Sequence, residues 1–189
     1  MDLIQFFKEV VKVLKTGNVD YALAGGMIAS VYRENERTTN DLDFLIFSGE
    51  KTQEVASSII KKFKKIENKI RLNFILPDMP WFEEALKRAK FNEIDFGFGS
   101  VPCLTKEDVV ISKLYSLRND AQRFNDLDEL KSIFHAGFDI DIPYICGQMQ
   151  KMGLPVPDSL KSMAPKSLLL TSKRIRRQSR RNFVKNIDK

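Results

Sequence analysis

A glycine pair directly after a short apolar run constrains the fold of this 189-residue chain more than any other feature. Residues 21–24 predict a buried strand, because they are apolar or aromatic and end at Gly25 and Gly26. The residues that follow predict a short helix over 27–32. A strand that turns through two glycines into a helix is therefore the starting unit of the fold.

Two aspartates on the next predicted strand, residues 41–47, complete this unit. Side chains alternate along a strand, so Asp41 and Asp43 share one face, while Leu42 and Phe44 point into the core. Two carboxylates on one face repel each other unless a cation lies between them. Backbone N–H groups at a helix start bind phosphate, and glycine lets the backbone approach closely. The unit therefore predicts a site for a metal and a phosphate.

The rest of the chain divides near residue 104 into a mixed α/β part, residues 1–104, and a helical part, residues 105–189. Apolar periodicity and turn residues set the expected boundaries. In the first part we expect helices over 2–15, 50–65 and 81–88 and strands over 70–76, 91–98 and 101–103. In the second part we expect helices over 105–117, 126–135, 141–152 and 166–186. The fold class is therefore α/β (α+β), with a small mixed sheet, flanking helices and a C-terminal helical bundle.

Composition excludes several classes of protein. Hydrophobic residues make up 43% of the chain, which is enough for a packed core. Two cysteines are too few for a disulfide framework, and no apolar run is long enough to span a membrane. The first residues also lack the pattern of a secretion signal. We therefore expect a cytoplasmic protein that does not bind membranes.

Positive charge is concentrated at the end of the chain. The formal net charge is +6, and residues 166–189 hold nine Lys or Arg and one Asp, so the remainder carries −2. This basic segment predicts contact with the phosphates of RNA. The alternatives are a solvated helix face, or a helix that docks on the body through the stripe of Leu168, Ser172, Ile175, Ser179 and Phe183.

Several motifs, in order, resemble the nucleotidyltransferase-like AbiEii/AbiGii toxin family of the polymerase-β-like nucleotidyltransferase superfamily. The resemblance runs from about residue 5 to 135 and leaves the basic tail outside. The segments that carry it are Leu23–Gly26, Arg37–Phe44, Pro80–Ala89, Leu104–Leu114 and Arg123–Leu127.

This resemblance implies a nucleotidyltransferase fold and metal-dependent transfer of a nucleotidyl group from a nucleoside triphosphate to an RNA or protein acceptor. It also implies a toxin of a bacterial toxin–antitoxin or phage-defence pair, with an antitoxin partner. The implied catalytic residues are Asp41, Asp43, Lys113 and Asp126, with the two strand aspartates as ligands of Mg²⁺ or Mn²⁺. The implied nucleotide-binding residues are Gly25, Gly26, Arg37, Thr39 and Lys113.

The sequence departs from the family at one position. A third acidic residue is usual on the next strand, but the best-fitting segment, residues 70–76, carries Asn73 there. An asparagine can ligate a cation through its carbonyl oxygen, yet it adds no charge and is a poor base. Asp95 has the right local pattern but comes one strand later. Either Asp95 substitutes, or the third role is missing and activity is weakened.

Simpler interpretations stay open for each residue. The glycines fit an ordinary turn, and the two aspartates fit a solvent-facing edge strand. Lys113 could be a solvated helix lysine, and Asp126 could be a helix N-cap. For the whole chain, the alternatives to a nucleotidyltransferase are a degenerate protein that binds nucleotide or RNA without turnover, and an RNA-binding protein that acts through its tail.

Overall fold

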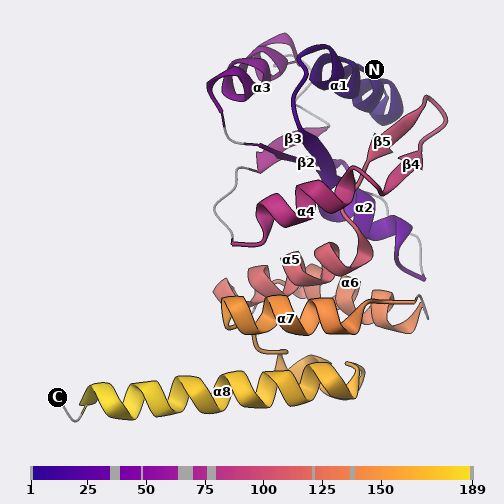
Figure 1. Cartoon of the computed structure of the whole chain (residues 1–189). Coiled ribbons are helices and arrows are strands. Elements are labelled where there is room, and N and C mark those ends of the chain that lie inside the picture. Colours follow the sequence, from indigo (N-terminus) through magenta and orange to yellow (C-terminus); the bar gives the residue numbers. More distant parts are fainter. Residues whose placement is uncertain are drawn as a thin grey trace. The chain divides into compact units, whose positions relative to one another are not determined.

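The computed structural model describes residues 2–34, 39–47, 49–63, 70–75, 80–120, 122–136 and 139–187, with side chains as far as residue 179. The chain divides into two compact units (Figure 1). The α/β unit comprises Met1–Val31 and Glu36–Thr105, and the helical unit comprises Tyr32–Asn35 and Lys106–Lys189. The domain boundary that we expect near residue 104 stays a prediction.

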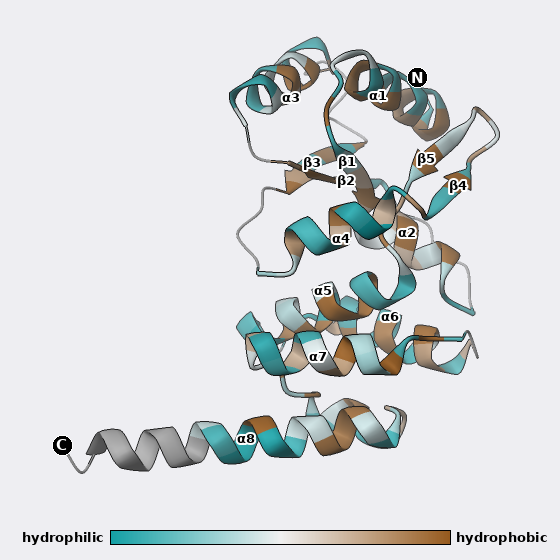
Figure 2. Cartoon of the chain, in the orientation of Figure 1, coloured by the Kyte–Doolittle hydropathy of each residue, from teal (hydrophilic) through white to brown (hydrophobic). Residues whose placement is uncertain are grey.

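A three-stranded mixed sheet forms the centre of the α/β unit. Strand β2 (Asp41–Ile46) lies between β1 (Tyr21–Ala24), to which it is antiparallel, and β3 (Arg71–Ile75), to which it is parallel. The other edge of β1 is also paired, because the N–H of Leu104 donates to the carbonyl of Leu23 over 2.9 Å. Figure 2 shows that the strands of this sheet are largely hydrophobic. Strand β2 is paired on both sides, so its register is fixed by β1 and by β3.

Helices α1 (Leu3–Thr16) and α3 (Glu50–Phe63) pack on one side of the sheet (Figure 1). The carboxylate of Asp2 caps α1 by accepting from the N–H of Gln5 over 2.8 Å. The fully buried Phe7 of α1 lies 5.9 Å from Phe44 of β2, measured between ring centroids. Because Phe44 faces α1, the alternation along β2 turns Asp41 and Asp43 to the opposite side, as expected.

The opposite side carries α2 (Gly25–Val31) and α4 (Phe82–Ala89). A separate hairpin, β4 (Glu93–Asp95) and β5 (Ser100–Pro102), turns through two glycines with positive φ, 80° at Gly97 and 122° at Gly99. The predicted strand over residues 91–98 is therefore too long. Its first residue, Phe91, is 93% exposed, and the glycine turn begins directly after Phe96.

The helical unit contains four α-helices and one short 3₁₀ helix among its described residues. They are α5 (Lys106–Asn119), α6 (Phe124–His135), α7 (Ile142–Met152), η1 (Asp158–Leu160) and α8 (Lys166–Ile187). Helix α5 packs against α6 and α7, and α7 packs against α8. The Asp141 carboxylate caps α7, which ends at Gly153 in the left-handed conformation.

The expected architecture, a mixed α/β part followed by helices, is confirmed. The boundaries of the expected helices agree within about two residues wherever both ends lie in the described part of the chain. No helix among the described residues is long and apolar enough to span a membrane.

Candidate functional site

Two carboxylates of β2 and two side chains of β3 meet on one face of the central sheet. The parallel register places Asp41 beside Arg71 and Asp43 beside Asn73. The amide nitrogen of Asn73 donates to Oδ1 of Asp43 over 2.8 Å. The Nε atom of Arg71 lies 3.0 Å from Oδ1 of Asp41. Each aspartate therefore has a positively polarised partner on the neighbouring strand, a pairing that we term the β2–β3 carboxylate edge.

The glycine turn between β1 and α2 lies directly against this edge. Gly25 has φ of +66°, a conformation that favours glycine, and a Cβ atom there would lie 1.8 Å from Oδ2 of Asp43. The backbone of the turn and the Asp43 carboxylate are thus in direct contact, which leaves no space for any side chain. An ordinary turn would require only the positive φ at this position. The close approach of Asp43 is a second reason why position 25 must be glycine.

The carboxylate edge fits a divalent cation of the Mg²⁺ type. Oδ1 of Asp41 is shielded from solvent and accepts no hydrogen bond from the part of the chain that is described, since Arg71 lies near it without hydrogen-bond alignment. No group of three or more acidic, His or Cys side chains suited to a metal occurs among the described residues. Mg²⁺ does not need one, because it is commonly held by one or two carboxylates together with substrate phosphates and water.

The structure separates the two candidates for the third position. Asn73 lies beside Asp43, whereas Asp95 belongs to the β4–β5 hairpin. There Oδ1 of Asp95 accepts from the N–H groups of Gly97 and Gly99, at 2.8 and 3.2 Å. In the described structure, Asp95 is therefore a turn residue, and Asn73 is the residue that contacts the carboxylate edge.

Of the two predicted nucleotide-binding residues in the loop before β2, the structure describes Thr39 but not Arg37. The hydroxyl of Thr39 accepts from the N–H of Asp41 over 3.1 Å, so Thr39 holds the start of the strand in a local turn. Arg37 lies outside the described residues. The nucleotide-binding roles of both stay predictions.

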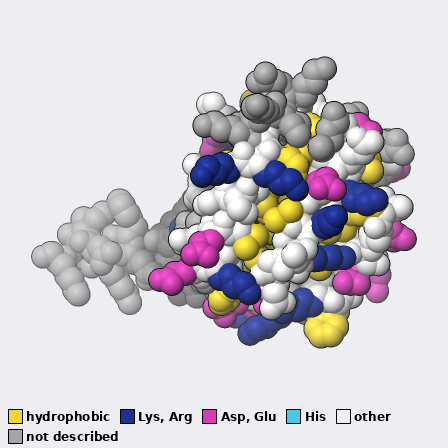
Figure 3. All heavy atoms as spheres, turned by 90° about the horizontal axis from the view of Figure 1, so that it is seen from above, with side chains coloured by type: hydrophobic (Ala, Val, Ile, Leu, Met, Phe, Trp, Pro, Cys, Tyr) yellow, Lys and Arg dark blue, Asp and Glu magenta, His cyan; other side chains and the backbone are white. Residues whose placement is uncertain are grey.

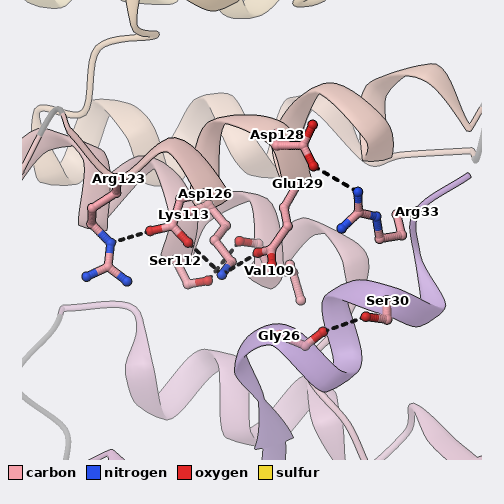
Figure 4. A network of polar contacts seen from close by, with 10 residues as sticks. All are labelled: Gly26, Ser30, Arg33, Val109, Ser112, Lys113, Arg123, Asp126, Asp128 and Glu129. Atoms are coloured by element: carbon pink, nitrogen blue, oxygen red, sulfur yellow. Dashed lines mark hydrogen bonds and ion pairs between the residues drawn. The ribbon is translucent and has the colours of Figure 1, made fainter. Parts of the chain in front are cut away.

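Lys113 belongs to a buried ionic network in the helical unit (Figure 4). Its Nζ atom lies 2.8 Å from Oδ1 of Asp126 and 2.5 Å from Oε2 of Glu129, both on α6. The other oxygen of Asp126 accepts from Nε of Arg123. Two cations and two carboxylates thus balance, in what we term the α5–α6 network.

The two cations of the α5–α6 network, Lys113 and Arg123, stay charged at neutral pH. Burial lowers the pKa of Lys113, but Glu129 and Asp126 together raise it by more, so the pKa lies above its usual value. The hydrogen bond to Asp126 likewise raises the pKa of Arg123. The interpretation of Lys113 as a solvated lysine is therefore wrong. Asp126 is not an N-cap either, because α6 begins at Phe124 and is preceded by Arg123.

Three charged residues that the sequence analysis does not single out form ion pairs in or near these clusters. Arg71 pairs with Asp41 at the carboxylate edge, and Glu129 pairs with Lys113. Arg33, whose side chain is buried, pairs with Asp128 of α6 over 2.9 Å within the helical unit (Figure 4). Helical spacing could have pointed to Glu129, since it lies three residues after Asp126 and shares its face. Register could have pointed to Arg71 only after β3 had been aligned with β2.

Comparison with known proteins identifies solved structures with a similar fold. Neither a protein-family model nor a curated protein matches the sequence. An antigenic nucleotidyltransferase-like protein from Paracoccidioides brasiliensis is 15% identical, with a TM-score of 0.49 over 87% of this chain and 92% of that one. The solution structure of the antibiotic-resistance factor ANT(2'')-Ia is 10% identical, with a TM-score of 0.50 over all of both chains.

The similarity to ANT(2'')-Ia extends over both chains in full, and it shows that this chain has a nucleotidyltransferase-like fold. The expected fold is thereby confirmed. Membership of the AbiEii/AbiGii family is not shown by these comparisons, and it stays a resemblance of motifs.

Proposed function

We propose that this protein is a metal-dependent nucleotidyltransferase whose metal and triphosphate bind at the β2–β3 carboxylate edge. The observation that carries the proposal is the contact between Gly25 and Asp43. It brings a backbone turn without a side chain against one of two carboxylates that share a strand face. The nucleotidyltransferase-like fold supports the same activity.

Each residue of the edge has a defined task in the proposed reaction. Asp41 and Asp43 lie two positions apart on one strand, so the sheet fixes the distance between their carboxylates. A bound Mg²⁺ would stabilise negative charge on the phosphate oxygens. Gly25 and Gly26 leave room for the triphosphate beside the metal ligands. Catalysis at such a site depends mainly on positioning and on charge stabilisation.

Asn73 has a positioning task and cannot serve as a base. Its amide donates to Asp43, and it therefore holds that carboxylate in a fixed orientation. An amide does not accept a proton at neutral pH, so the acceptor hydroxyl must lose its proton to another group, such as solvent. We expect slow turnover for this reason.

The biological role that we propose is that of a cytoplasmic toxin in a toxin–antitoxin or phage-defence pair, with RNA or a protein as acceptor and an antitoxin as partner. The motif resemblance supports this role. The roles that it implies for Lys113 and Asp126 remain predictions. Induced expression in bacteria tests the toxic role, since growth arrest should require Asp41 and Asp43.

A transfer assay tests the proposed activity. The protein is incubated with Mg²⁺, each α-labelled nucleoside triphosphate in turn, and total RNA or cell protein. We expect label transfer by the wild type and a loss of at least about 100-fold with Asp41→Asn or Asp43→Asn. Glu54→Gln, which removes an exposed carboxylate of α3, is the matched control and should leave the rate unchanged. Transfer at equal rates by wild type and Asp41→Asn would refute the proposal.

Nucleotide binding without turnover is the second candidate function. The replacement of a carboxylate by Asn73, hydrogen-bonded to Asp43, is the observation that favours it. This function predicts Mg²⁺-dependent binding of nucleoside triphosphate that is lost with Asp43→Ala, but no product with any acceptor. A labelled product that disappears with Asp43→Ala would exclude it.

A further inference from the structure

Helix α8 (Lys166–Ile187) is fixed to the helical unit along one face. Leu168, Ser172 and Ile175 are buried, and the helix packs against α7. The hydroxyl of Ser172 accepts from the N–H of Val156 over 2.9 Å. The stripe that the sequence predicts for docking is thus confirmed for these three residues, whereas Ser179 is exposed and the side chain of Phe183 lies outside the described part. One face of α8 therefore packs into the core of the helical unit.

Arg176 strengthens this attachment and is not available for a partner. Its guanidinium donates to the carbonyl of Val156 over 2.8 Å and pairs with Asp158 at 2.7 Å. The pKa of the exposed Asp158 is lowered, chiefly by the hydrogen bond from Arg176. One of the four described arginines and lysines between residues 173 and 177 therefore has a structural role.

The other three cations lie on the opposite side of α8. Lys173, Arg174 and Arg177 are exposed, and none of their side chains forms an ion pair or a hydrogen bond with any described residue. At about 100° per residue, they span an arc of about 100° whose centre lies about 180° from the centre of the buried stripe. We term this surface the basic arc of α8. Its position opposite the packed face leaves it open to a large partner.

Charge along α8 has a single sign. Residues 166–187 contain eight Lys or Arg and no acidic residue. The face of the α/β unit in Figure 3 differs, since its Lys and Arg side chains are interspersed with Asp and Glu. A surface with cations alone attracts a polyanion, and arginine adds planar donors that match phosphate oxygens.

A lipid surface fits the basic arc poorly. A helix that lies in a membrane interface inserts its apolar face, and the apolar face of α8 is already packed within the protein. One apolar side chain, Leu170, is exposed one turn before Lys173. A single exposed leucine buries too little apolar surface to hold the helix in a bilayer.

We propose that the basic arc of α8 binds the phosphate backbone of single-stranded RNA without preference for base sequence. Its described cations are all phosphate-binding side chains, and no aromatic side chain interleaves with them to stack on bases. A flexible single strand can follow such an arc along the helix. The choice of RNA among polyanions rests on the proposed function, in which RNA is a possible acceptor. The binding of a phosphate backbone is inferred from the charge and exposure of α8 alone.

Fluorescence anisotropy with a labelled 20-nucleotide RNA of mixed sequence tests this proposal on the full chain. The variant Lys173→Gln/Arg174→Gln/Arg177→Gln should bind about 10- to 100-fold more weakly at 0.1 M salt. Its plot of log affinity against log salt should be shallower by about 2, as expected for three phosphate contacts to a single strand. The control Lys8→Gln/Lys51→Gln/Lys61→Gln removes the same charge from exposed lysines of α1 and α3, and it should bind like the wild type.

Three outcomes would overturn the proposal. They are equal RNA affinity for wild type and the arc variant, tighter binding of a 20-base-pair DNA duplex than of RNA, and comparable binding of phosphatidylserine vesicles. Circular dichroism and urea unfolding check that the arc variant folds. The variant Asp41→Asn should bind RNA like the wild type and lose only nucleotidyl transfer, so failure of the RNA proposal and failure of the proposed activity are distinguishable.

Discussion

The β2–β3 carboxylate edge and the α5–α6 network are both sets of paired acids and cations, but the central ion pair of the network is buried and that of the edge is not. At the edge, the side chains of Arg71 and Asp41 are 78% and 39% exposed. In the network, those of Lys113 and Asp126 are 11% and 4% exposed. Water reaches most of the Arg71 side chain and part of that of Asp41, although Oδ1 of Asp41 is itself shielded, and it is largely excluded from Lys113 and Asp126. The same residue types can therefore serve a ligand in one place and the fold in another.

Energetics sharpen this difference. An exposed ion pair contributes about 0–1 kcal/mol, so Arg71 can leave Asp41 at little cost when a cation arrives. A buried charge without its partner costs about 3–5 kcal/mol, so the members of the network depend on one another. The carboxylate edge can thus exchange partners, whereas the α5–α6 network holds two helices together.

The largest expected effect is that of Lys113→Met. It leaves Asp126 with Arg123 but removes the cation that faces Glu129, and it should lower the free energy of unfolding by about 3–5 kcal/mol. Urea unfolding at pH 7 measures the loss. Lys131→Met on α6, the helix that carries Asp126 and Glu129, removes a cation that pairs with no described residue, and it should change stability by less than about 0.5 kcal/mol.

A double variant checks that the loss comes from an unpaired charge. Lys113→Met/Glu129→Gln removes one cation and one carboxylate and leaves Arg123 paired with Asp126. We expect it to be more stable than the sum of the single effects predicts, by about 1–3 kcal/mol. If the two single effects on the free energy of unfolding are strictly additive, Lys113 and Glu129 are not coupled. The members of the network would then not depend on one another, and the contrast with the carboxylate edge would be wrong.

The sequence predicted the carboxylate edge better than the network because local rules govern it. Alternation on a strand placed Asp41 and Asp43 on one face, and a glycine pair marked the turn, so neighbouring residues sufficed. Lys113 and Asp126 were identified as candidate site residues only through the motif resemblance. Burial of Lys113 depends on how α5 and α6 pack, and a helical pattern alone does not distinguish a buried lysine from a solvated one.

Two features needed contacts between residues distant in sequence. The hydrogen bond from Asn73 to Asp43 follows from the register of β3 against β2, and it decided between Asn73 and Asp95 as neighbour of the edge. The contact of Gly25 with Asp43 follows from the pairing of β1 with β2. The glycine pair can be read from the sequence. Its contact with the Asp43 carboxylate, which excludes a side chain at Gly25, cannot be read there.

The second largest effect should be that of Gly25→Ala. The new Cβ would combine a strained φ with an atom 1.8 Å from Asp43, so we expect a loss of about 2–4 kcal/mol and no detectable nucleotide binding. Gly153→Ala is the matched control, since φ there is +63° and nothing lies within 4 Å of the added atom. It should cost about 1–2 kcal/mol. Equal losses in urea unfolding would mean that the contact with Asp43 contributes nothing.

Asn73→Asp should affect metal binding and stability in opposite directions. A third carboxylate beside Asp43 adds a hard ligand, so Mn²⁺ affinity measured by calorimetry should rise by about tenfold. Without metal, the lost hydrogen bond and the like charges should lower the free energy of unfolding by about 0.5–1.5 kcal/mol. Asn125→Asp adds the same charge at an exposed position of α6 and should change neither quantity. Unchanged Mn²⁺ affinity in Asn73→Asp would place the metal away from Asp43.

The smallest expected effect, that of Arg71→Ala, tests directly whether the carboxylate edge exchanges partners. Arg71 and a metal ion compete for Asp41, so removing the guanidinium should raise Mn²⁺ affinity by about two- to fivefold at low salt. The gain should shrink at high salt, because salt already screens this exposed pair. Lys62→Ala, which breaks the similarly exposed pair with Glu9, is the control and should leave Mn²⁺ affinity unchanged. A fall in affinity with Arg71→Ala would mean that Arg71 orients Asp41 for the metal and does not compete with it, so the edge would be as interdependent as the α5–α6 network.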